Sequence, residues 1–258
     1  MKTLVTTVAP GIYKFDTGPF NWYVIEDGGR LTLVDAGFVG HARILEEGLP
    51  QIGRDLQDVE ALVLTHAHAD HVGFAEKLRR RLKIPVYVHR EDAGAARSRL
   101  VLPWTGLISN AWRPAVAEML VHAVRNGVFW TPALERVEVI EDGETLDVPG
   151  RPTVIHTPGH TRGEVSFLLP DRRVLFAGDT LVTRGLLNGA HGAPVIPEPA
   201  LSDEHAVAVA SVQRLVGLGD LTILTGHGRP WSGSADEAVA SALESAAKYQ
   251  EPMLAPAV

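Results

Sequence analysis

The residues of this chain that could most readily perform chemistry lie between Leu64 and Gly73, in the sequence Leu-Thr-His-Ala-His-Ala-Asp-His-Val-Gly. Six consecutive positions contain three imidazoles and one carboxylate, namely His66, His68, Asp70 and His71. Neutral imidazole and carboxylate groups are ligands for divalent metals, zinc above all. Chance grouping of polar loop residues explains so dense a cluster poorly, so we interpret this segment as half of a metal site.

Other metal-capable residues follow further predicted strands. Strands are predicted to end near residues 65, 156, 178 and 225, each just before a histidine or aspartate. Since strand ends of one sheet system can meet at one edge, we expect these donors to converge. The expected cluster contains five imidazoles and two carboxylates: His66, His68, Asp70, His71, His160, Asp179 and His227. Without sulfur, this set suits two divalent ions, zinc first, with iron or manganese as alternatives.

The composition narrows the class of protein. The chain has no cysteine, which excludes disulfides, thiolate ligands and a thiol nucleophile. A formal charge of −7 argues against a general nucleic-acid surface. The first residues lack the apolar core of a signal peptide, and no apolar run approaches the length of a membrane span. We therefore expect a cytoplasmic protein that acts on a small molecule, with no nucleic-acid or membrane partner.

The first half of the chain alternates between strand and helix patterns, which predicts an α/β domain. Strands are predicted at 12–15, 21–26, 31–34, 60–64 and 85–89, and helices at 41–52 and 73–82. This alternation places the His-rich segment on a strand-to-helix loop, where a rigid scaffold can position a site.

The second half contains more strands before its last helices. Strands are predicted at 136–140, 144–148, 153–156, 165–169, 174–176 and 221–225, and helices at 203–216 and 234–249. Ser202 is the expected N-cap of the first helix, and Ser234 with Glu237 forms a capping box on the second. Residues 185–199 read as a Gly- and Pro-rich loop that contains His191, and the tail from residue 251 as loosely packed.

We take residues 1–258 to be a single domain. Within it, residues 92–135 form an insertion that is richer in aromatic residues than the rest. This insertion contains Trp104, Trp112 and Trp130, and Pro114 is expected to start a helix that ends at Arg125. Ordinary core packing explains the aromatic content about as well as a lid over the site or a contact within a homo-oligomer. Under the lid interpretation, Trp104 and Trp112 are candidate substrate contacts, and so is His191.

The chain resembles the metallo-β-lactamase fold superfamily over roughly residues 10–235. The matching motifs are His-x-His-x-Asp-His at 66–71, Thr-Pro-Gly-His-Thr around His160, Gly-Asp-Thr around Asp179, Gly-His-Gly around His227 and Val-Asp-Ala-Gly around Asp35. The resemblance implies an αβ/βα four-layer sandwich, in which two mixed β-sheets pack face to face with helices on their outer faces.

The resemblance also implies a division of the ligands. His66, His68 and His160 would hold one ion, Asp70, His71 and His227 the other, and Asp179 would bridge the two. Asp35 would accept a hydrogen bond from a ligand histidine. Two neighbouring cations lower the pKa of a shared water, so a bridging hydroxide could attack a carbonyl near neutral pH. Asp70 would orient that hydroxide as well as bind metal.

Departures from known subfamilies limit the choice of substrate. β-Lactamases with a cysteine ligand are excluded, and the all-His/Asp β-lactamases lack a carboxylate at the position of Asp179. Bacterial acyl-homoserine lactonases have a tyrosine where this chain has Val182. Glyoxalase II enzymes share the seven ligands but add a helical glutathione-binding domain, whereas only about thirty residues follow His227 here.

The sequence therefore predicts a dinuclear zinc hydrolase that cleaves an ester, thioester or lactone bond, without assigning a subfamily. A mononuclear-iron oxidoreductase similar to persulfide dioxygenases and a β-lactam hydrolase are the alternative enzymes. A non-catalytic, metal-stabilised scaffold is a third interpretation, against which the complete ligand set and Asp70 both count.

Overall fold

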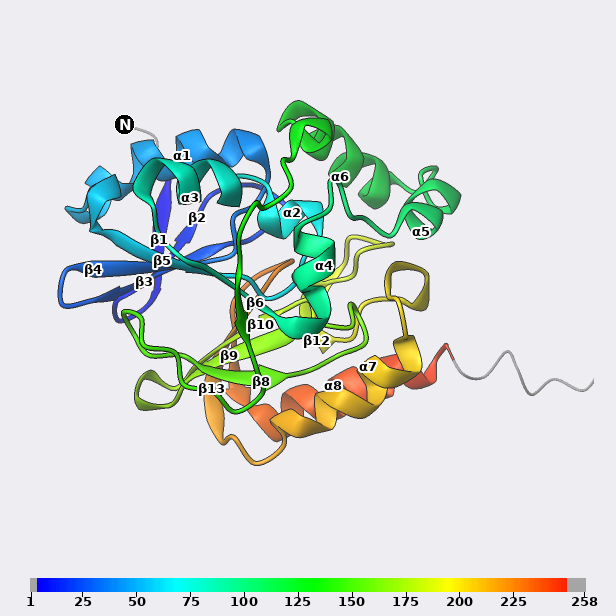
Figure 1. Ribbon diagram of the computed structural model, residues 1–258. Coiled ribbons are helices and arrows are strands. Elements are labelled where there is room, and N and C mark those ends of the chain that lie inside the picture. Colours follow the sequence, from blue (N-terminus) through cyan, green and yellow to red (C-terminus); the bar gives the residue numbers. More distant parts are fainter. Residues whose placement is uncertain (1–3, 250–258) are drawn as a thin grey trace, which may run out of the picture.

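A computed structural model describes residues 4–249, and its strands form two main sheets that pack face to face (Figure 1). The first sheet has seven strands in chain order: β1 (Val5–Ala9), β2 (Ile12–Phe15), β3 (Tyr23–Asp27), β4 (Arg30–Val34), β5 (Val59–Val63), β6 (Val86–His89) and β7 (Glu138–Ile140). Strands β1 to β4 pair antiparallel, and β4 to β7 pair parallel.

The second sheet has five strands in the order β14 (Trp231–Ser234), β13 (Asp220–Thr225), β10 (Val174–Gly178), β9 (Val165–Leu169) and β8 (Thr153–His156). It is mixed as well, because β10 pairs parallel with β13 whereas the other neighbours pair antiparallel. Apolar side chains from both sheets, among them Val63 and Phe176, form the buried layer between them. Burial of such apolar area is the main force that holds the sheets together.

Helices cover both outer faces. Helices α1 (Ala42–Gly48) and α3 (Ala75–Leu82) pack on the first sheet, and α7 (His205–Ser211) and α8 (Ala235–Ala247) pack on the second (Figure 1). Leu45 and Leu78 bury their side chains against the first sheet, and Ala242 lies against the second. The layers run helix, sheet, sheet, helix, and the predicted four-layer sandwich is confirmed.

Several local predictions differ from the structure. Residues 144–148 form no strand and contribute one isolated bridge, Thr145 with Thr153, because their apolar alternation reflects burial of Leu146 and Val148 between the sheets. The predicted 185–199 loop instead contains a strand, β12 (His191–Val195), which pairs antiparallel with β11 (Val182–Arg184) directly before the loop. The predicted tail from residue 251 lies outside the described residues.

The helix predicted at 203–216 is also shorter than expected. Its α-helical part is α7, which continues as a 3-10 turn over Val212–Leu215. Its N-cap is Glu204 rather than Ser202. Ser234 is the N-cap of α8 as predicted, because its side chain accepts a hydrogen bond from the Asp236 backbone N–H at 3.2 Å. The predicted capping box with Glu237 is not formed, since no Glu237 hydrogen bond to the Ser234 backbone is present among the described residues.

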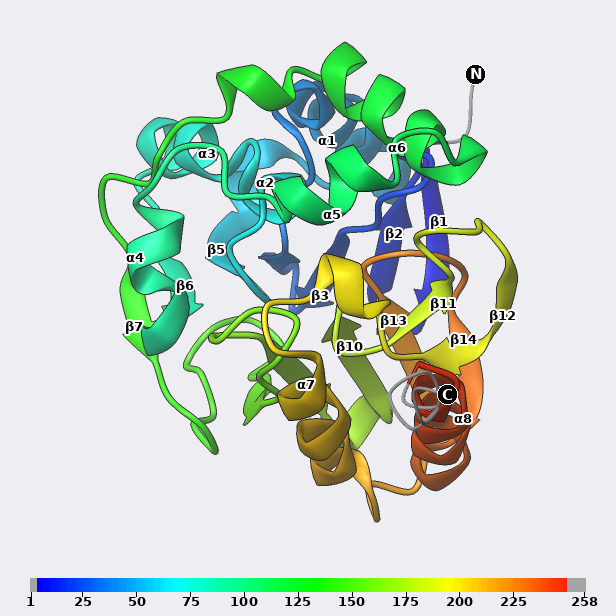
Figure 2. The same ribbon diagram turned by 90° about the vertical axis from the view of Figure 1, so that its right-hand side faces the viewer.

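The insertion between β6 and β7 folds into short helices, α4 (Ala93–Ala96), α5 (Trp104–Ser109) and α6 (Pro114–Arg125). We call residues 100–130 the cap. Its apolar residues Leu107, Val116 and Met119 pack over Phe20 and Phe38 near α2 (Ala69–Val72), as Figure 2 shows for the helices. Among the described residues, no helix has the length and apolarity that crossing a membrane requires.

Candidate metal centre

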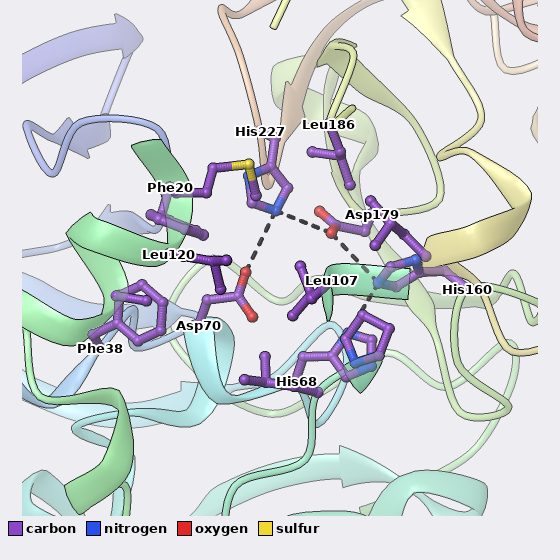
Figure 3. A pocket seen from close by; sticks show the side chains of 15 residues that line it. Phe20, Phe38, His68, Asp70, Leu107, Leu120, His160, Asp179, Leu186 and His227 are labelled. Carbon is purple, nitrogen blue, oxygen red and sulfur yellow. Dashed lines mark hydrogen bonds and ion pairs between the residues drawn. The ribbon is translucent and has the colours of Figure 1, made fainter. Parts of the chain in front are cut away.

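The structure brings all seven predicted ligands to one buried cluster beneath the cap. The His-rich loop leaves β5 and enters α2, His160 follows β8, Asp179 follows β10 and His227 follows β13. Asp70, at 8% exposure, is the most accessible of the seven. Figure 3 shows His68, Asp70, His160, Asp179 and His227 pointing toward a common centre. Segments far apart in the chain therefore meet because their strands end at the same edge of the sandwich.

One group of nitrogens comes from His66, His68 and His160. Nε2 of His66 lies 3.1 Å from Nδ1 of His68, and Nε2 of His160 lies 3.0 Å from the same atom. One ring nitrogen of each residue can therefore approach a single ion, and the three donor atoms all lie within 4.8 Å of one another. Three imidazoles with room for a further ligand suit zinc.

A second group comes from Asp70, His71 and His227. Nε2 of His227 lies 3.4 Å from Oδ2 of Asp70, and Nε2 of His71 lies 3.7 Å from that oxygen. Asp179 stands between the groups, with its Oδ2 3.5 Å from Nε2 of His160 and 3.2 Å from Nε2 of His227. One carboxylate can therefore reach both positions.

The polar atoms of this cluster leave a place for metal ions. Oδ1 of Asp179 is buried and has no hydrogen-bond partner among the described residues. Buried carboxylate oxygens are rarely unpaired, so an unmatched one indicates an absent cation or donor. Nitrogen and oxygen donors without sulfur fit a divalent metal ion, and the residues present fit the group that the sequence implies.

Asp35 fixes the orientation of His71. Its Oδ2 lies 2.8 Å from Nδ1 of His71 and accepts a hydrogen bond from the Thr65 hydroxyl at 2.9 Å, while Oδ1 accepts from the Thr65 backbone N–H at 2.8 Å. Asp35 adopts a left-handed backbone with φ of 65°, which aspartate tolerates better than most residues. A carboxylate in this position selects the tautomer whose Nε2 is free to bind metal.

Two positioning carboxylates were not predicted from the sequence. Glu164 is fully buried, with its Oε2 3.0 Å from Nδ1 of His66, and its Oε1 accepts a hydrogen bond from the Asp179 backbone N–H at 3.0 Å. It therefore joins a ligand of one group to the residue between the groups. The only sequence signal is a charged residue directly before a buried strand, which is too common to identify a site.

Asp92 is the second unpredicted carboxylate, and it connects two ligand loops. Its Oδ2 accepts hydrogen bonds from the Ala67 backbone N–H and the Thr161 hydroxyl, both at 2.9 Å, and its Oδ1 accepts from the Gly163 backbone N–H at 2.8 Å. The loop of His66 and the loop of His160 are therefore held together by a buried side chain from the start of the insertion.

Burial and neighbouring charges shift the pKa values of the cluster's side chains in opposite directions. Burial lowers the pKa values of His71 and His227, but the neighbouring carboxylates outweigh it and raise them to about 9 and about 10. Burial raises the pKa of Asp70, yet His71 and His227 bring it down to about 2. Burial also lowers the pKa values of His68 and His160 to about 4. Because metal ions require neutral imidazoles, metal must displace protons from His71 and His227.

An apolar cavity opens between the cluster and the cap (Figure 3). Its floor is polar, with His68, Asp70, His160, Asp179 and His227, and its walls are apolar, with Phe20, Phe38, Leu102, Pro103, Leu107, Met119, Leu120, Ala123, Leu186 and Leu201. No lysine or arginine is among the described residues that line it. The cavity therefore suits an apolar group of a ligand next to the metal-binding side chains.

The suggested substrate contacts lie outside this cavity. Trp104, Trp112 and His191 are absent from the lining of this cavity. Helix α5 turns Leu107 inward, so Trp104 remains 39% exposed, and Trp112 is 75% exposed under the Arg113 guanidinium. His191 is exposed on β12. The cap does cover the site, but it does so with leucine, methionine and proline rather than with tryptophan.

A histidine pair fastens the cap to the body beside this cavity. Nε2 of buried His41 lies 3.1 Å from Nε2 of His122 on α6, and Nδ1 of His41 accepts a hydrogen bond from the Phe38 backbone N–H at 3.1 Å. His41 must therefore be the neutral tautomer with its proton on Nε2, which donates to His122. Protonation of either ring would remove an acceptor and break one of the two bonds.

We expect this pair to make stability fall at acidic pH. Burial and the neighbouring His122 lower the pKa of His41 to about 3, and burial lowers that of His122, whereas an unfolded histidine titrates near about 6.5. The contribution is complete above pH 6.5 and is lost as pH falls toward the folded-state pKa, by up to about 1.4 kcal/mol per pH unit for His41 and by less for the half-exposed His122. Urea unfolding of metal-free wild type and His41→Asn between pH 7.5 and 5 tests this. Equal pH slopes in the two proteins would contradict it.

Comparison with known proteins agrees with this geometry. Residues 16–227 match the family model described as the metallo-beta-lactamase superfamily. The chain is 28% identical over 241 residues to "Probable metallo-hydrolase YflN" of Bacillus subtilis, covering 87% of this chain and 86% of that protein. An uncharacterized protein of Mycobacterium leprae is 33% identical over 221 residues, covering 81% of this chain and 86% of that protein.

Solved structures give the same result for the fold. A metallo-beta-lactamase family protein from Thermus thermophilus superposes with a TM-score of 0.65 at 27% identity, covering 95% of this chain and 81% of that one. A B3 metallo-beta-lactamase described as having an active-site glutamic acid superposes with a TM-score of 0.67 at 22% identity, covering 98% and 91%. At that lower identity the likeness extends to the fold alone.

Proposed function

This chain belongs to the metallo-beta-lactamase superfamily, and we propose that it is a dinuclear zinc hydrolase that cleaves an ester, thioester or lactone bond in a small molecule. The observation that carries the proposal is the position of Asp179, whose Oδ2 lies within 3.5 Å of a nitrogen from each ligand group. The proposed ligands are His66, His68 and His160 for one ion, Asp70, His71 and His227 for the other, and Asp179 for both.

Zinc ions bound to these side chains would lower the pKa of a water molecule and polarise a substrate carbonyl. Asp70 is the proposed catalytic residue, because it is both a ligand and part of the cavity floor. Its carboxylate is well placed to orient an attacking water and to pass a proton to the leaving group. Asp35 and Glu164 keep His71 and His66 in the orientation that binding requires.

The apolar walls support a substrate with an acyl chain or an apolar ring beside the labile bond. The name of the Bacillus relative, a probable metallo-hydrolase, agrees with hydrolysis. Asp179 argues against a β-lactam substrate, because β-lactamases with only His and Asp ligands lack this carboxylate. Cytoplasmic location and assembly into a homo-oligomer stay predictions.

Metal analysis and a substrate panel test the proposal together. Protein purified without added metal is expected to contain about two zinc ions per chain. It is expected to hydrolyse at least one of 4-nitrophenyl esters, acyl thioesters and lactones, and to leave a chromogenic cephalosporin intact. One iron per chain with no hydrolysis would favour the oxidoreductase alternative, and hydrolysis of the cephalosporin alone would favour a β-lactamase.

A further inference from the structure

A second pocket, lined by charged and polar side chains, adjoins the apolar cavity between the ligand cluster and the cap. Three pairs of residues that are close in sequence each contribute one member to the second pocket and one to the cavity. Pro19, Glu118 and Arg184 line the second pocket, whereas Phe20, Met119 and Leu186 line the cavity. The two are also connected at His227, whose Nδ1 lies 2.9 Å from the Pro19 carbonyl oxygen, while Gly228 lines the second pocket. A ligand group in this pocket would therefore sit beside the metal centre.

The second pocket is cationic although the chain as a whole is acidic. Lys14 from β2, Arg184 from β11 and Arg229 after β13 line it. Glu118 from α6 is the only acidic side chain among its described lining residues. His191 lines it as well, and burial and nearby arginines lower the pKa of that imidazole. The lining thus carries three cations against one carboxylate.

Arg184 shows that the pocket is built to take an acceptor. The residue is only 7% exposed, and its Nη1 is buried without a hydrogen-bond partner among the described residues. Its Nη2 forms an ion pair with Oε2 of Glu118, whose side chain is 60% exposed. A buried guanidinium normally has its donors satisfied, because unpaired buried donors destabilise a fold. Arg184 therefore has an unpaired donor, and its carboxylate partner among the described residues, Glu118, is a largely exposed side chain.

The other cations have free donors too. Lys14 Nζ donates to Oδ1 of Asn21 at 3.2 Å, which leaves two of its three protons without a partner among residues 4–249. Arg229 is exposed at the pocket edge. Guanidinium and ammonium groups together are the donors that bind phosphate and carboxylate oxygens.

We infer that this pocket is an oxyanion-binding site, which takes a phosphate or carboxylate group next to the metal centre. The Glu118 carboxylate pairs with the Arg184 guanidinium until the anion takes its place. An anion could arrive as the acidic group of a substrate whose apolar part fills the cavity, or as free phosphate. The site itself does not depend on the proposed hydrolase activity, whereas its use for a substrate rests on that proposed function.

Titration calorimetry with inorganic phosphate tests the site directly. Both the metal-loaded and the chelator-treated protein are used, so that phosphate bound to metal is recognised by its loss on chelation. We expect the metal-independent binding to weaken about tenfold in a Lys14→Gln/Arg229→Gln double variant, and to tighten severalfold in Glu118→Gln, which frees Arg184. Arg43→Gln, a substitution of an exposed arginine on α1, is the matched control and should bind as wild type does.

The variants avoid Arg184 because loss of a buried guanidinium could unfold the protein. Absence of metal-independent phosphate binding, or equal affinity in the double variant and wild type, would overturn the inference. Hydrolysis of mono-4-nitrophenyl succinate against neutral 4-nitrophenyl butyrate then identifies the source of the anion. A preference for succinate that disappears in the double variant indicates a substrate group, and no preference indicates free phosphate. If neither ester is hydrolysed, the phosphate result still decides the site, and only the hydrolase proposal is weakened.

Discussion

Replacing Asp70 with asparagine is expected to lower kcat/KM by about a thousandfold while the protein stays folded, a loss within the usual range for removal of a general base. Asparagine keeps the size of the side chain and one oxygen that can contact metal. It removes the negative charge that faces Nε2 of His227 at 3.4 Å and Nε2 of His71 at 3.7 Å. The loss should appear mainly in kcat, because the group acts on the attacking water rather than on substrate binding.

Metal content must be measured on the same sample. The expected result is a large loss of turnover that persists when zinc is restored in excess. Asp147→Asn is the matched control, since the Asp147 side chain is fully exposed and lies outside the site. Turnover within tenfold of wild type in a zinc-loaded Asp70→Asn protein would mean that Asp70 does not position the nucleophile. Full recovery with excess zinc would mean that it acts only as a ligand.

The ligand set could be predicted from the sequence because each donor sits at the end of a strand with a clear local pattern. Strand β8 at 153–156 and strand β9 at 165–169 have the predicted bounds, and helix α6 has the predicted start at Pro114 and end at Arg125. Regular spacing of apolar residues and a proline in the first helical turn indicate the bounds of a strand or helix from neighbouring residues alone. Their convergence follows from the sheet arrangement.

The residues that hold the ligands in place could not be predicted in the same way. Asp92 bonds to Ala67 and to Gly163, which lie 25 and 71 positions away, and no local pattern records such a contact. The inward face of the cap was missed for a related reason. Its tryptophans suggested that they form the wall of the substrate cavity. The orientation of the cap helices decides which side chains face the cavity, and in the structure Leu107 faces it while Trp112 is exposed to solvent.

These positioning residues hold the ligand side chains in place. Asp35 holds His71, Glu164 contacts both His66 and the backbone of Asp179, and Asp92 ties together the loops on either side. Such preorganised ligands lose little conformational freedom when the ion enters, which favours binding. The affinity of the centre should therefore depend on residues that never touch the metal.

A Glu164→Gln variant tests that dependence, and we expect it to bind the zinc of the proposed His66, His68 and His160 group about 10 to 100 times less tightly than wild type. If Nε2 of His66 bound the metal, the proton would remain on Nδ1, which lies 3.0 Å from Oε2 of Glu164. That oxygen has no hydrogen-bond partner among the described residues, while Oε1 accepts a hydrogen bond from the Asp179 backbone N–H at 3.0 Å. A glutamine has one acceptor and one donor in place of two acceptors. Whichever way its amide is turned, one N–H must face another N–H in a fully buried place.

Competition with a chelator measures the effect. One zinc per chain is expected to leave at a chelator concentration about 10 to 100 times lower than in wild type, with the other retained. Glu138→Gln, on the exposed side of β7, is the matched control and should keep the wild-type profile. Burial raises the pKa of the Glu164 carboxyl in the metal-free protein, so a bound cation must favour its ionised form. Zinc affinity in wild type should accordingly fall more steeply with decreasing pH than in Glu164→Gln. If both proteins release zinc at the same chelator concentration, Glu164 fills space and does not support the metal.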